Sequence, residues 1–473
     1  MLFSSPLFLY LFLPLTLLLF YFSDAKLKNG VLLFASLVFF AWGGVAYSII
    51  LVLSILVNYL FGYLVSRKKG SRAYLGLGVG INLGVLVVFK YADFIVANLN
   101  SLFENFQIKP IDQPNILLPI GISFFTFQAI SYLIDVYRKE VVYQKNLVNL
   151  ALYISLFPQL IAGPIVRYHD IASQLVKRDF SLEKFGEGVQ RFIIGLSKKV
   201  LLANNFAIVA DEILDSDFAD LTTPVAWIGI VAYAFQIYFD FSGYSDMAIG
   251  LGKMFGFTIL ENFNFPYISK SIKEFWRRWH ISLSTWFRDY LYIPLGGSRV
   301  SNSRTYFNLL IVFLLTGFWH GASWSFMFWG AFHGLFLVLE RLGLDKLLRK
   351  TWQPVQHMYA MLVVLIGWVF FRVESIDEAF FYLKRMFVNN ALLENNWLSY
   401  FDTKFTIVLF IGIISSTSFF PWIGSLYSKY LVQNRTINLA SNTVYFLILN
   451  ALLILSTFYL VAGSYNPFIY FRF

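Results

Sequence analysis

The 473-residue chain contains no cysteine. This absence excludes disulfide bonds, thiolate metal sites and cysteine nucleophiles, including the thioester relay of a palmitoylating enzyme. Any acyl transfer by this chain must therefore use other groups.

Charge is also scarce, because only 14% of the residues are charged, whereas 58% are hydrophobic and 20% are aromatic. A soluble globular domain carries about 25% charged residues, so the composition predicts a polytopic membrane protein with an all-α fold. Apolar segments run from residue 7 to residue 462, and no polar block is long enough for a separate domain. We therefore expect one integral membrane domain over 1–473, with its core motifs in 117–340.

The net charge of +10 first suggests nucleic acid as a partner. The basic residues, however, cluster at the ends of apolar segments, where orientation signals and contacts with lipid phosphates need them. We therefore expect membrane lipids, and no nucleic acid, as partners.

A cleaved signal peptide is not expected, because no basic residue precedes the first apolar run and the following SDAKLK lacks a small-x-small site. Candidate membrane helices of spanning or partly spanning length follow along the chain. Several are broken by Gly or Pro, as in re-entrant segments. The predicted segments are 7–22, 31–46, 48–65, 74–96, 117–137, 146–162, 186–208, 224–250, 305–318, 323–342, 358–372, 404–422 and 441–462.

The basic residues that follow the first, third and fifth segments fall on one side if the chain alternates across the membrane. This bias places the N-terminus outside, 97–116 in an outer loop and 66–73 in an inner one. We find no internal repeat, so the hallmark of many transporters is missing.

The longest amphipathic block is 262–300, where tryptophans and tyrosines accompany Arg277, Arg278 and Arg288. Such a block is typical of helices at the cytoplasmic interface. Its simplest role is that of an interfacial anchor, and the alternative is that the arginines contact the phosphates of a donor molecule.

The chain contains only five histidines. His169 and His357 are expected near an interface. His280 ends the run EFWRRWH, and His320 lies between Gly317 and Gly321, where small residues let a substrate or helix come close. A neutral imidazole can take a hydroxyl proton and return it, as acyl transfer requires.

The fifth histidine, His333, follows His320 by 13 residues, roughly 220° around a continuous helix. The two imidazoles would then not share a face, and we expect His333 to be a packed structural residue.

A second polar intrusion, 236–257, places Asp240, Ser242, Ser245 and Asp246 in an apolar span. Intramembrane carboxylates are functional candidates, so Asp240 and Asp246 are predicted to bind substrate. The structural alternative pairs them with the arginines of 262–300. Because GYSDM lacks the final glycine of a G-x-S-x-G elbow, Ser245 is not supported as a hydrolase nucleophile.

Several sequence blocks together resemble the membrane-bound O-acyltransferase family, and within it the bacterial alginate O-acetylase branch. They cover most of 117–340 and the C-terminus, and no P-loop, H-E-x-x-H or dinucleotide fingerprint competes with them. The blocks are LPIGISFFTFQAISYLIDVYR, FPQLIAGPIVRYHDI, YFDFSGYSDMAIGLGKMFGF, NFPYISKSIKEFWRRWHISLSTWFRDYLYIPLGGSR, GFWHGASWSFMFWGAFHG and SYNPFIYFRF.

The resemblance implies a ring of roughly 11–14 transmembrane, re-entrant and interfacial helices around a funnel through a thinned membrane. It implies His320 as general base and His280 as the group that orients substrate or stabilises charge, beside a substrate-binding Trp319. The ending 468–473 reads F-x-Y-x-x-F, similar to the companion peptide of teichoic-acid D-alanylation. By that resemblance Tyr470 accepts the acyl group, and the alternative is a plain aromatic tail.

These observations predict an O-acetyltransferase of the bacterial inner membrane, with acetyl-CoA as donor substrate and neither a metal nor a bound cofactor. It would pass acetyl groups outward, through an extracytoplasmic partner, to the hydroxyls of an alginate-like polymer, cellulose or peptidoglycan. An acyl-carrier protein stays open as donor. The alternatives are a proton-coupled transporter or flippase of an envelope precursor and a structural subunit of an export complex.

Overall fold

A computed structural model describes residues 1–473 apart from 68, 162, 389–396, 431–434, 464 and 470–473. Every regular element within these described residues is helical, as the composition predicts. The helices of the first half are α1 Leu13–Phe22, α2 Lys28–Ala41, α3 Val45–Ser66, α4 Ser71–Asn105, α5 Ile122–Tyr137, α6 Leu147–Ser155, α7 Phe157–Leu160, α8 Tyr168–Val176, α9 Leu182–Ser197, α10 Asn204–Leu214 and α11 Thr223–Met254.

The second half of the chain begins with short helical pieces and continues with longer helices. Its α-helices are α12 Ile272–Arg278, α13 Ile281–Phe287, α14 Asn302–His320, α15 Trp324–Leu339, α16 Asp345–Leu348, α17 Gln353–Arg372, α18 Ile376–Phe387, α19 Thr403–Ser415, α20 Phe419–Tyr430 and α21 Arg435–Val461. Short π- or 3-10-helical turns are η1 Phe8–Phe12, η2 Lys198–Ala203, η3 Phe218–Asp220, η4 Pro266–Ile268, η5 Arg288–Tyr292, η6 Glu340–Leu344 and η7 Trp397–Tyr400.

Among the described residues, seven helices are long and apolar enough to cross a membrane, or eight if the bent pair α19–α20 is one span. Of the other segments predicted from the sequence, 305–318 lies in the continuous helix α14, which is not among the candidate spans, and most of the rest are too short or are broken. For example, Pro421 has no N–H to donate to the carbonyl of Thr417, so the chain bends by 61° between α19 and α20. One helix is longer than predicted, because α4 continues to Asn105 and the start of the predicted outer loop 97–116 is therefore helical.

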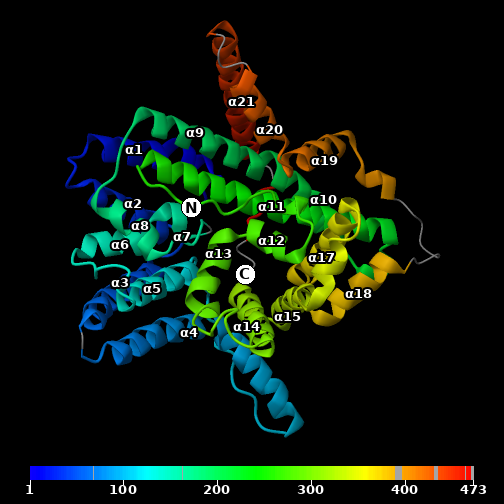
Figure 1. Cartoon of the computed structure of the whole chain (residues 1–473), viewed down its shortest axis with the longest axis horizontal. Helices are drawn as coiled ribbons and strands as arrows, with labels where there is room; N and C mark the ends of the chain where they lie inside the picture. The colour runs from blue at the N-terminus through cyan, green and yellow to red at the C-terminus, as the bar shows by residue number, and fades with distance from the viewer. Residues whose placement is uncertain (68, 162, 389–396, 431–434, 464, 470–473) are drawn as a thin grey trace.

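The helices form a body with α11, α12 and α13 near its centre (Figure 1). The helices α1–α8 lie on one side of this centre, and α17 and α18 lie on the other. In the two spans that include α9 and α11, 78% of the most apolar window is buried, compared with 11% in the span that includes α21. Thus α9 and α11 form the interior of the membrane domain.

Two reciprocal glycine pairs let α9 and α11 approach closely. A Cβ on Gly188 would lie 2.7 Å from the carbonyl oxygen of Gly250, and one on Gly250 would lie 2.6 Å from that of Gly188. Gly195 and Gly243 face each other in the same way, at 2.6 and 2.7 Å. Small residues at such contacts allow backbone packing that larger side chains would block.

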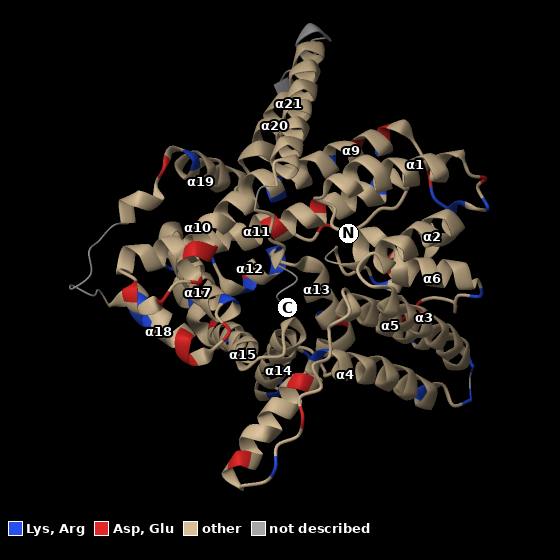
Figure 2. Cartoon of the chain, turned by 180° about the vertical axis from the view of Figure 1, so that it is seen from behind, with Lys and Arg blue, Asp and Glu red and all other residues tan. Residues whose placement is uncertain are grey.

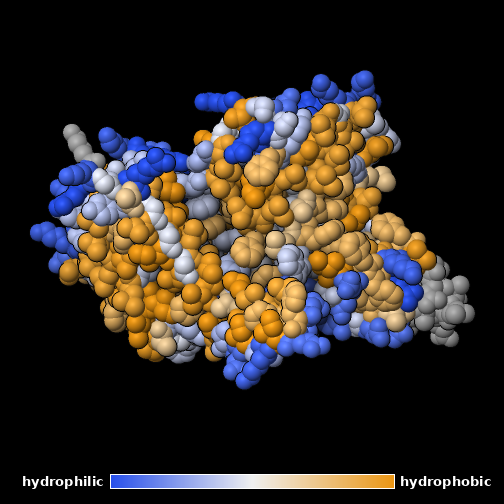
Figure 3. Space-filling model, turned by 90° about the horizontal axis from the view of Figure 1, so that it is seen from below, coloured by the Kyte–Doolittle hydropathy of each residue, from blue (hydrophilic) through white to orange (hydrophobic). Residues whose placement is uncertain are grey.

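The surface has the pattern expected of a membrane domain. Figure 3 shows a broad apolar band with hydrophilic residues gathered along its upper and lower margins. Figure 2 shows most charged residues at helix ends and in loops, with a smaller group near α11 and α12 at the centre. Charges placed in the interior of such a body need partners or a function.

Candidate active site

His320 is the last residue of α14, where this helix turns back into α15 (Figure 1). The two helices of the hairpin pack closely at Gly317 and Gly330, where the facing backbone leaves no room for a side chain. A Cβ on Gly317 would lie 2.2 Å from the carbonyl oxygen of Phe326, and one on Gly330 would lie 2.2 Å from that of Phe313. The imidazole of His320 is thus fixed at the end of a closely packed helix pair, and it is 6% exposed.

His280 lies in the link between α12 and α13, with φ of +44°, an unusual conformation for a residue other than glycine. Asn262 fixes its ring. The Oδ1 atom of Asn262 accepts hydrogen bonds from the backbone N–H of Ser282 at 3.1 Å and from its hydroxyl at 2.9 Å, and it lies 3.1 Å from Nδ1 of His280. Because this oxygen only accepts, Nδ1 carries a proton, and Nε2 of a neutral His280 is the acceptor.

The structure brings His280 and His320 together. Their ring centroids lie 6.5 Å apart, so both rings can contact one reacting group. Aromatic rings enclose the pair: Trp319, Trp329 and Phe371 lie 4.9, 5.2 and 5.1 Å from His320 between centroids. This surrounding excludes bulk water, and buried polar chemistry is strongest in such sites.

Lys90 and Tyr91 of α4 hold the carbonyl end of α14. The Lys90 ammonium donates to the carbonyl oxygens of Trp319 at 2.5 Å and of His320 at 3.0 Å. The Tyr91 hydroxyl donates to the carbonyl oxygen of Phe318 at 2.7 Å. A cation is favourable at a helix C-terminus. Lys90 was not identified from the sequence. The signal was available, because a lysine inside the apolar segment 74–96 is a charged residue in a membrane span, and such residues are paired or functional.

A basic cavity of about 540 Å³ lies beside α13 and α14. Of the three arginines predicted to contact a donor, Arg277 and Arg288 line it, whereas Arg278 pairs with Glu274 at 2.9 Å and does not line it. Thr316, one helical turn before His320, is part of its wall. Further basic side chains at this cavity are Lys273, Arg341 and Lys346, and the acidic Glu340 and Asp345 also line it, so its charged lining is mainly basic.

The segment 465–469 comes close to His320 at the C-terminal end of α14. Phe468 lines a cavity of about 110 Å³ together with His320, Trp319 and Lys90. Ile469 and His320 both line a smaller space of about 20 Å³. Tyr470 lies outside the described residues, and Phe468 and Ile469 are the two residues that precede it.

Asp240 and Asp246 are buried on α11, but the predicted pairing with the arginines of 262–300 is wrong. Asp240 pairs with Lys199 at 2.6 Å. Asp246 pairs with Arg191 at 2.6 Å and with Lys198 at 2.7 Å. The cationic partners lie on α9 and η2 because the glycine contacts press α9 against α11. Both carboxylates thus hold fixed cations, which disfavours a role as exchangeable proton carriers.

His333 is separated from His320 by a helix end, so the angle of a continuous helix does not apply. It lies on α15, and its ring packs against Trp276 and Trp329 at centroid distances of 5.1 and 5.2 Å. Trp329 therefore contacts both histidines. Buried among aromatic rings at 1% exposure, His333 has the packed position that the sequence predicts.

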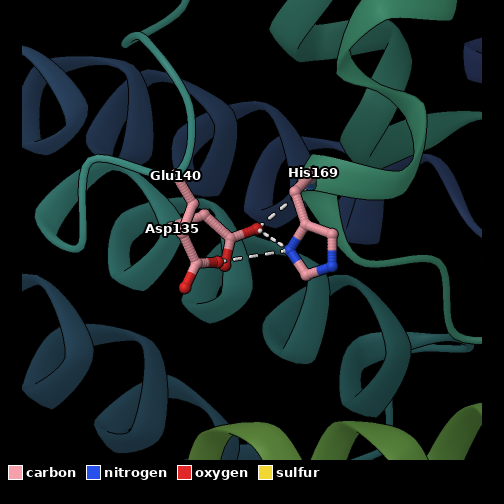
Figure 4. Close-up of side chains that lie close together, drawn as sticks. All are labelled: Asp135, Glu140 and His169. Carbon is pink, nitrogen blue, oxygen red and sulfur yellow. Dashed lines mark hydrogen bonds and ion pairs between the residues drawn. The ribbon is translucent and has the colours of Figure 1, made fainter.

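A separate polar cluster joins α5 to α8 (Figure 4). Asp135 is fully buried and lies 3.0 Å from Nδ1 of His169, while Glu140 lies 3.6 Å from the same nitrogen. Tyr290 also donates to Asp135 at 2.7 Å. The hydrogen bond to Asp135 raises the pKa of His169. The cluster satisfies a buried carboxylate and ties two helices together.

Comparisons with known proteins identify the family of the chain. A model of the family described as MBOAT, membrane-bound O-acyltransferase, matches residues 123–376. The chain is 49% identical to the probable alginate O-acetylase AlgI of Azotobacter vinelandii, over 82% of this chain and 78% of that protein. It is 37% identical to the peptidoglycan O-acetyltransferase of Helicobacter pylori, over 82% and 80%. It is 32% identical to the teichoic acid D-alanyltransferase of Streptococcus thermophilus, over 49% and 58%. Since the family model covers more than half of the chain and relatives match most of it, the chain is a multi-pass membrane acyltransferase that belongs to the membrane-bound O-acyltransferase family.

Proposed function

We propose that this protein is an O-acetyltransferase of the bacterial inner membrane. It transfers acetyl from cytoplasmic acetyl-CoA to hydroxyls of an exported or cell-wall polysaccharide such as alginate, cellulose or peptidoglycan. The names of the relatives from Azotobacter vinelandii and Helicobacter pylori support acetyl as the acyl group and a polysaccharide as the acceptor. A partner on the outer side delivers the group to the polymer.

The basic cavity is the proposed donor site. Acetyl-CoA carries phosphates and a long pantetheine arm. The cationic side chains of Arg277, Arg288 and their basic neighbours suit the phosphates, because guanidinium groups bind them with charge-assisted hydrogen bonds. The apolar lining near Thr316 suits the arm, which leads the thioester along α14 toward His320. An acyl-carrier protein as donor would present the same arm but fewer phosphates to this cavity.

The proposed chemistry uses His320 as general base. It takes the proton of an acceptor hydroxyl while that oxygen attacks the thioester carbonyl carbon, and a C–O bond forms. His280 orients the reacting group and stabilises the developing charge. The C–S bond then breaks, and the proton moves from His320 to the leaving thiolate. Acetyl ester and free thiol are the products, so no oxidant or further reactant is needed.

The proposed acceptor is the phenol of Tyr470, which passes the acetyl group on to the partner. A phenol with a pKa near 10 needs a base to become nucleophilic. In the second step a polymer or partner hydroxyl attacks the tyrosyl ester, which restores the phenol. Phe468 and Ile469, which precede Tyr470, both line spaces shared with His320.

One observation carries the proposal: α14 connects the two sides of the reaction. Thr316 lines the basic cavity, and His320, one turn later, lines the cavities that contain Phe468 and Ile469. A single base therefore lies between a suitable donor site and a suitable acceptor segment.

The test is a reconstitution of the purified protein in proteoliposomes with acetyl-CoA radiolabelled in the acetyl group. We expect label on Tyr470 in the wild type and none in His320→Ala or Tyr470→Phe. A control with labelled acetyl-carrier protein identifies the donor. Absence of label from the wild type, or equal label in His320→Ala, would contradict the proposal, and flux without covalent transfer would favour a transporter.

A further inference from the structure

We infer that Lys199 and Asp240 form a clamp for the backbone of the C-terminal segment, which positions the acceptor that follows it. Acceptor positioning rests on the proposed function, whereas the clamp itself does not. Lys199 and Asp240 do not touch the reacting atoms, so they are positioning residues. Their binding target is a peptide segment of this chain, 465–469.

The clamp is an ion pair whose remaining polar atoms bind main chain. Lys199 of η2 and Asp240 of α11 are 1% and 3% exposed and lie 2.6 Å apart, Nζ to Oδ1. The other oxygen of Asp240 accepts the backbone N–H of Ile469 at 3.0 Å. The ammonium of Lys199 donates to the carbonyl oxygen of Pro467.

These two contacts bind main-chain groups that lie two residues apart in the sequence. The ammonium of Lys199 binds the C=O of Pro467, and the carboxylate of Asp240 binds the N–H of Ile469. Such recognition fixes the register of the segment without using its side chains.

The residues just before the clamp are fixed as well. The Tyr465 hydroxyl donates to Asp211 at 2.8 Å. Asn204 donates to the side-chain oxygen of Asn466 at 3.1 Å, and the amide of Asn466 donates to the carbonyl oxygen of Ser4 at 3.0 Å. The segment is therefore tied at successive residues, and Asp240 holds the last described one, directly before Tyr470.

The energetic cost of the pair indicates a role beyond stability. Burying two charges costs several kcal/mol per ion, and replacing such a pair with apolar residues of similar size is often neutral or stabilising. Stability alone therefore does not explain Lys199 and Asp240. The binding of Pro467 and Ile469 gives the two charges a task that apolar residues cannot perform.

The first experiment measures the position of the segment. Because the chain has no cysteine, Ile469→Cys introduces a single thiol at a site that is 7% exposed. We expect slow reaction with a maleimide in this background and about tenfold faster reaction when K199M/D240L is added. The control D135N/H169Q removes another pair with a fully buried carboxylate and should leave the rate unchanged. An unchanged rate in K199M/D240L would overturn the clamp.

The second experiment measures function, with label on Tyr470 as the readout. K199M/D240L should keep the thermal stability of the wild type but reduce labelling at least tenfold. The reversed pair K199D/D240K restores the ion pair, yet its lysine cannot accept the N–H of Ile469, so labelling should stay low.

Each outcome of the second experiment decides one part of the inference. Recovery of labelling in the reversed pair would show an ordinary ion pair and overturn the clamp. K199M/D240L could keep normal labelling of Tyr470 even though the same two substitutions make the thiol of Ile469→Cys reactive. That combination would overturn the positioning role. If the wild type itself lacks label, the relay fails while the maleimide rates still decide the clamp.

Discussion

Replacing Lys90 with methionine removes a positive charge from the end of the helix that presents His320. Methionine keeps a flexible apolar stem of similar length, so the packing of α4 changes little. The carbonyl oxygens of Trp319 and His320 lose the ammonium that lies 2.5 and 3.0 Å away. The last turn of α14 then holds its shape only through the remaining contacts.

The expected magnitudes differ for stability and for activity. Two hydrogen bonds from a charged donor contribute about 1.5–3 kcal/mol each, but removing a buried ammonium also removes a desolvation cost of several kcal/mol. These terms largely offset each other, so the free energy of unfolding should change by less than about 2 kcal/mol. A displacement of His320 by about 1 Å, in contrast, should lower kcat about 100-fold, or about 2.7 kcal/mol of barrier at about 1.36 kcal/mol per tenfold.

The assay is steady-state transfer of labelled acetyl in proteoliposomes over a range of acetyl-CoA concentrations, with the thermal unfolding of each variant measured in parallel. We expect K90M to lower kcat with little change in the KM for acetyl-CoA. Y91F is the matched control, since it removes one neutral hydrogen bond to Phe318 and should lower kcat less than tenfold. The reasoning is refuted if K90M keeps kcat within about threefold of the wild type, or if Y91F loses as much as K90M.

Three further predictions follow from the same contacts. R277A should raise the KM for acetyl-CoA about 10- to 100-fold by removing a charge-assisted contact, whereas R278A should not, because Arg278 pairs with Glu274. G317A should destabilise the protein by about 1–3 kcal/mol, because its Cβ would meet the carbonyl oxygen of Phe326 at 2.2 Å. H169Q should lower thermal stability most below pH 6.5, where a pair with a raised pKa contributes fully, and the difference should shrink as pH rises through that pKa.

A specific experimental result would contradict each of these predictions. Equal KM values of R277A and R278A for acetyl-CoA would show that the basic cavity is not the donor site. G80A is the control for G317A, since a Cβ on Gly80 meets nothing within 4 Å, and equal stability of the two variants would contradict the packing explanation. A stability difference between wild type and H169Q that grows with pH would contradict a raised pKa of His169.

The class of fold was predictable because composition alone identifies a helical membrane domain. The number of spans was not, because hydropathy does not register where a helix bends or where a short apolar segment packs inside the protein. Pro421 shows this, since the segment 404–422 looks continuous in hydropathy but divides into α19 and α20. Similarly, the predicted loop after residue 96 begins with further turns of α4.

The candidate site was predictable where residues of one type are rare. Five histidines in 473 residues made His280 and His320 visible, and the family resemblance paired them. The partners of Asp240 and Asp246 were not predictable, because Lys199 and Arg191 come next to them only through the glycine contacts of α9 and α11. Asn262 gave no signal either, since an asparagine acquires its role only once His280 and Ser282 surround it.

The contact between Asn466 and the carbonyl oxygen of Ser4 has a consequence for biosynthesis. Residues 465–469 follow α21 in the sequence and are therefore translated after the described α-helices. A ribosome that stops directly after α21 therefore releases a chain with all the described candidate spans but without the segment 465–469 that lines the cavities at His320. In such a chain the contacts of Lys199 with Pro467 and of Asp240 with Ile469 cannot form.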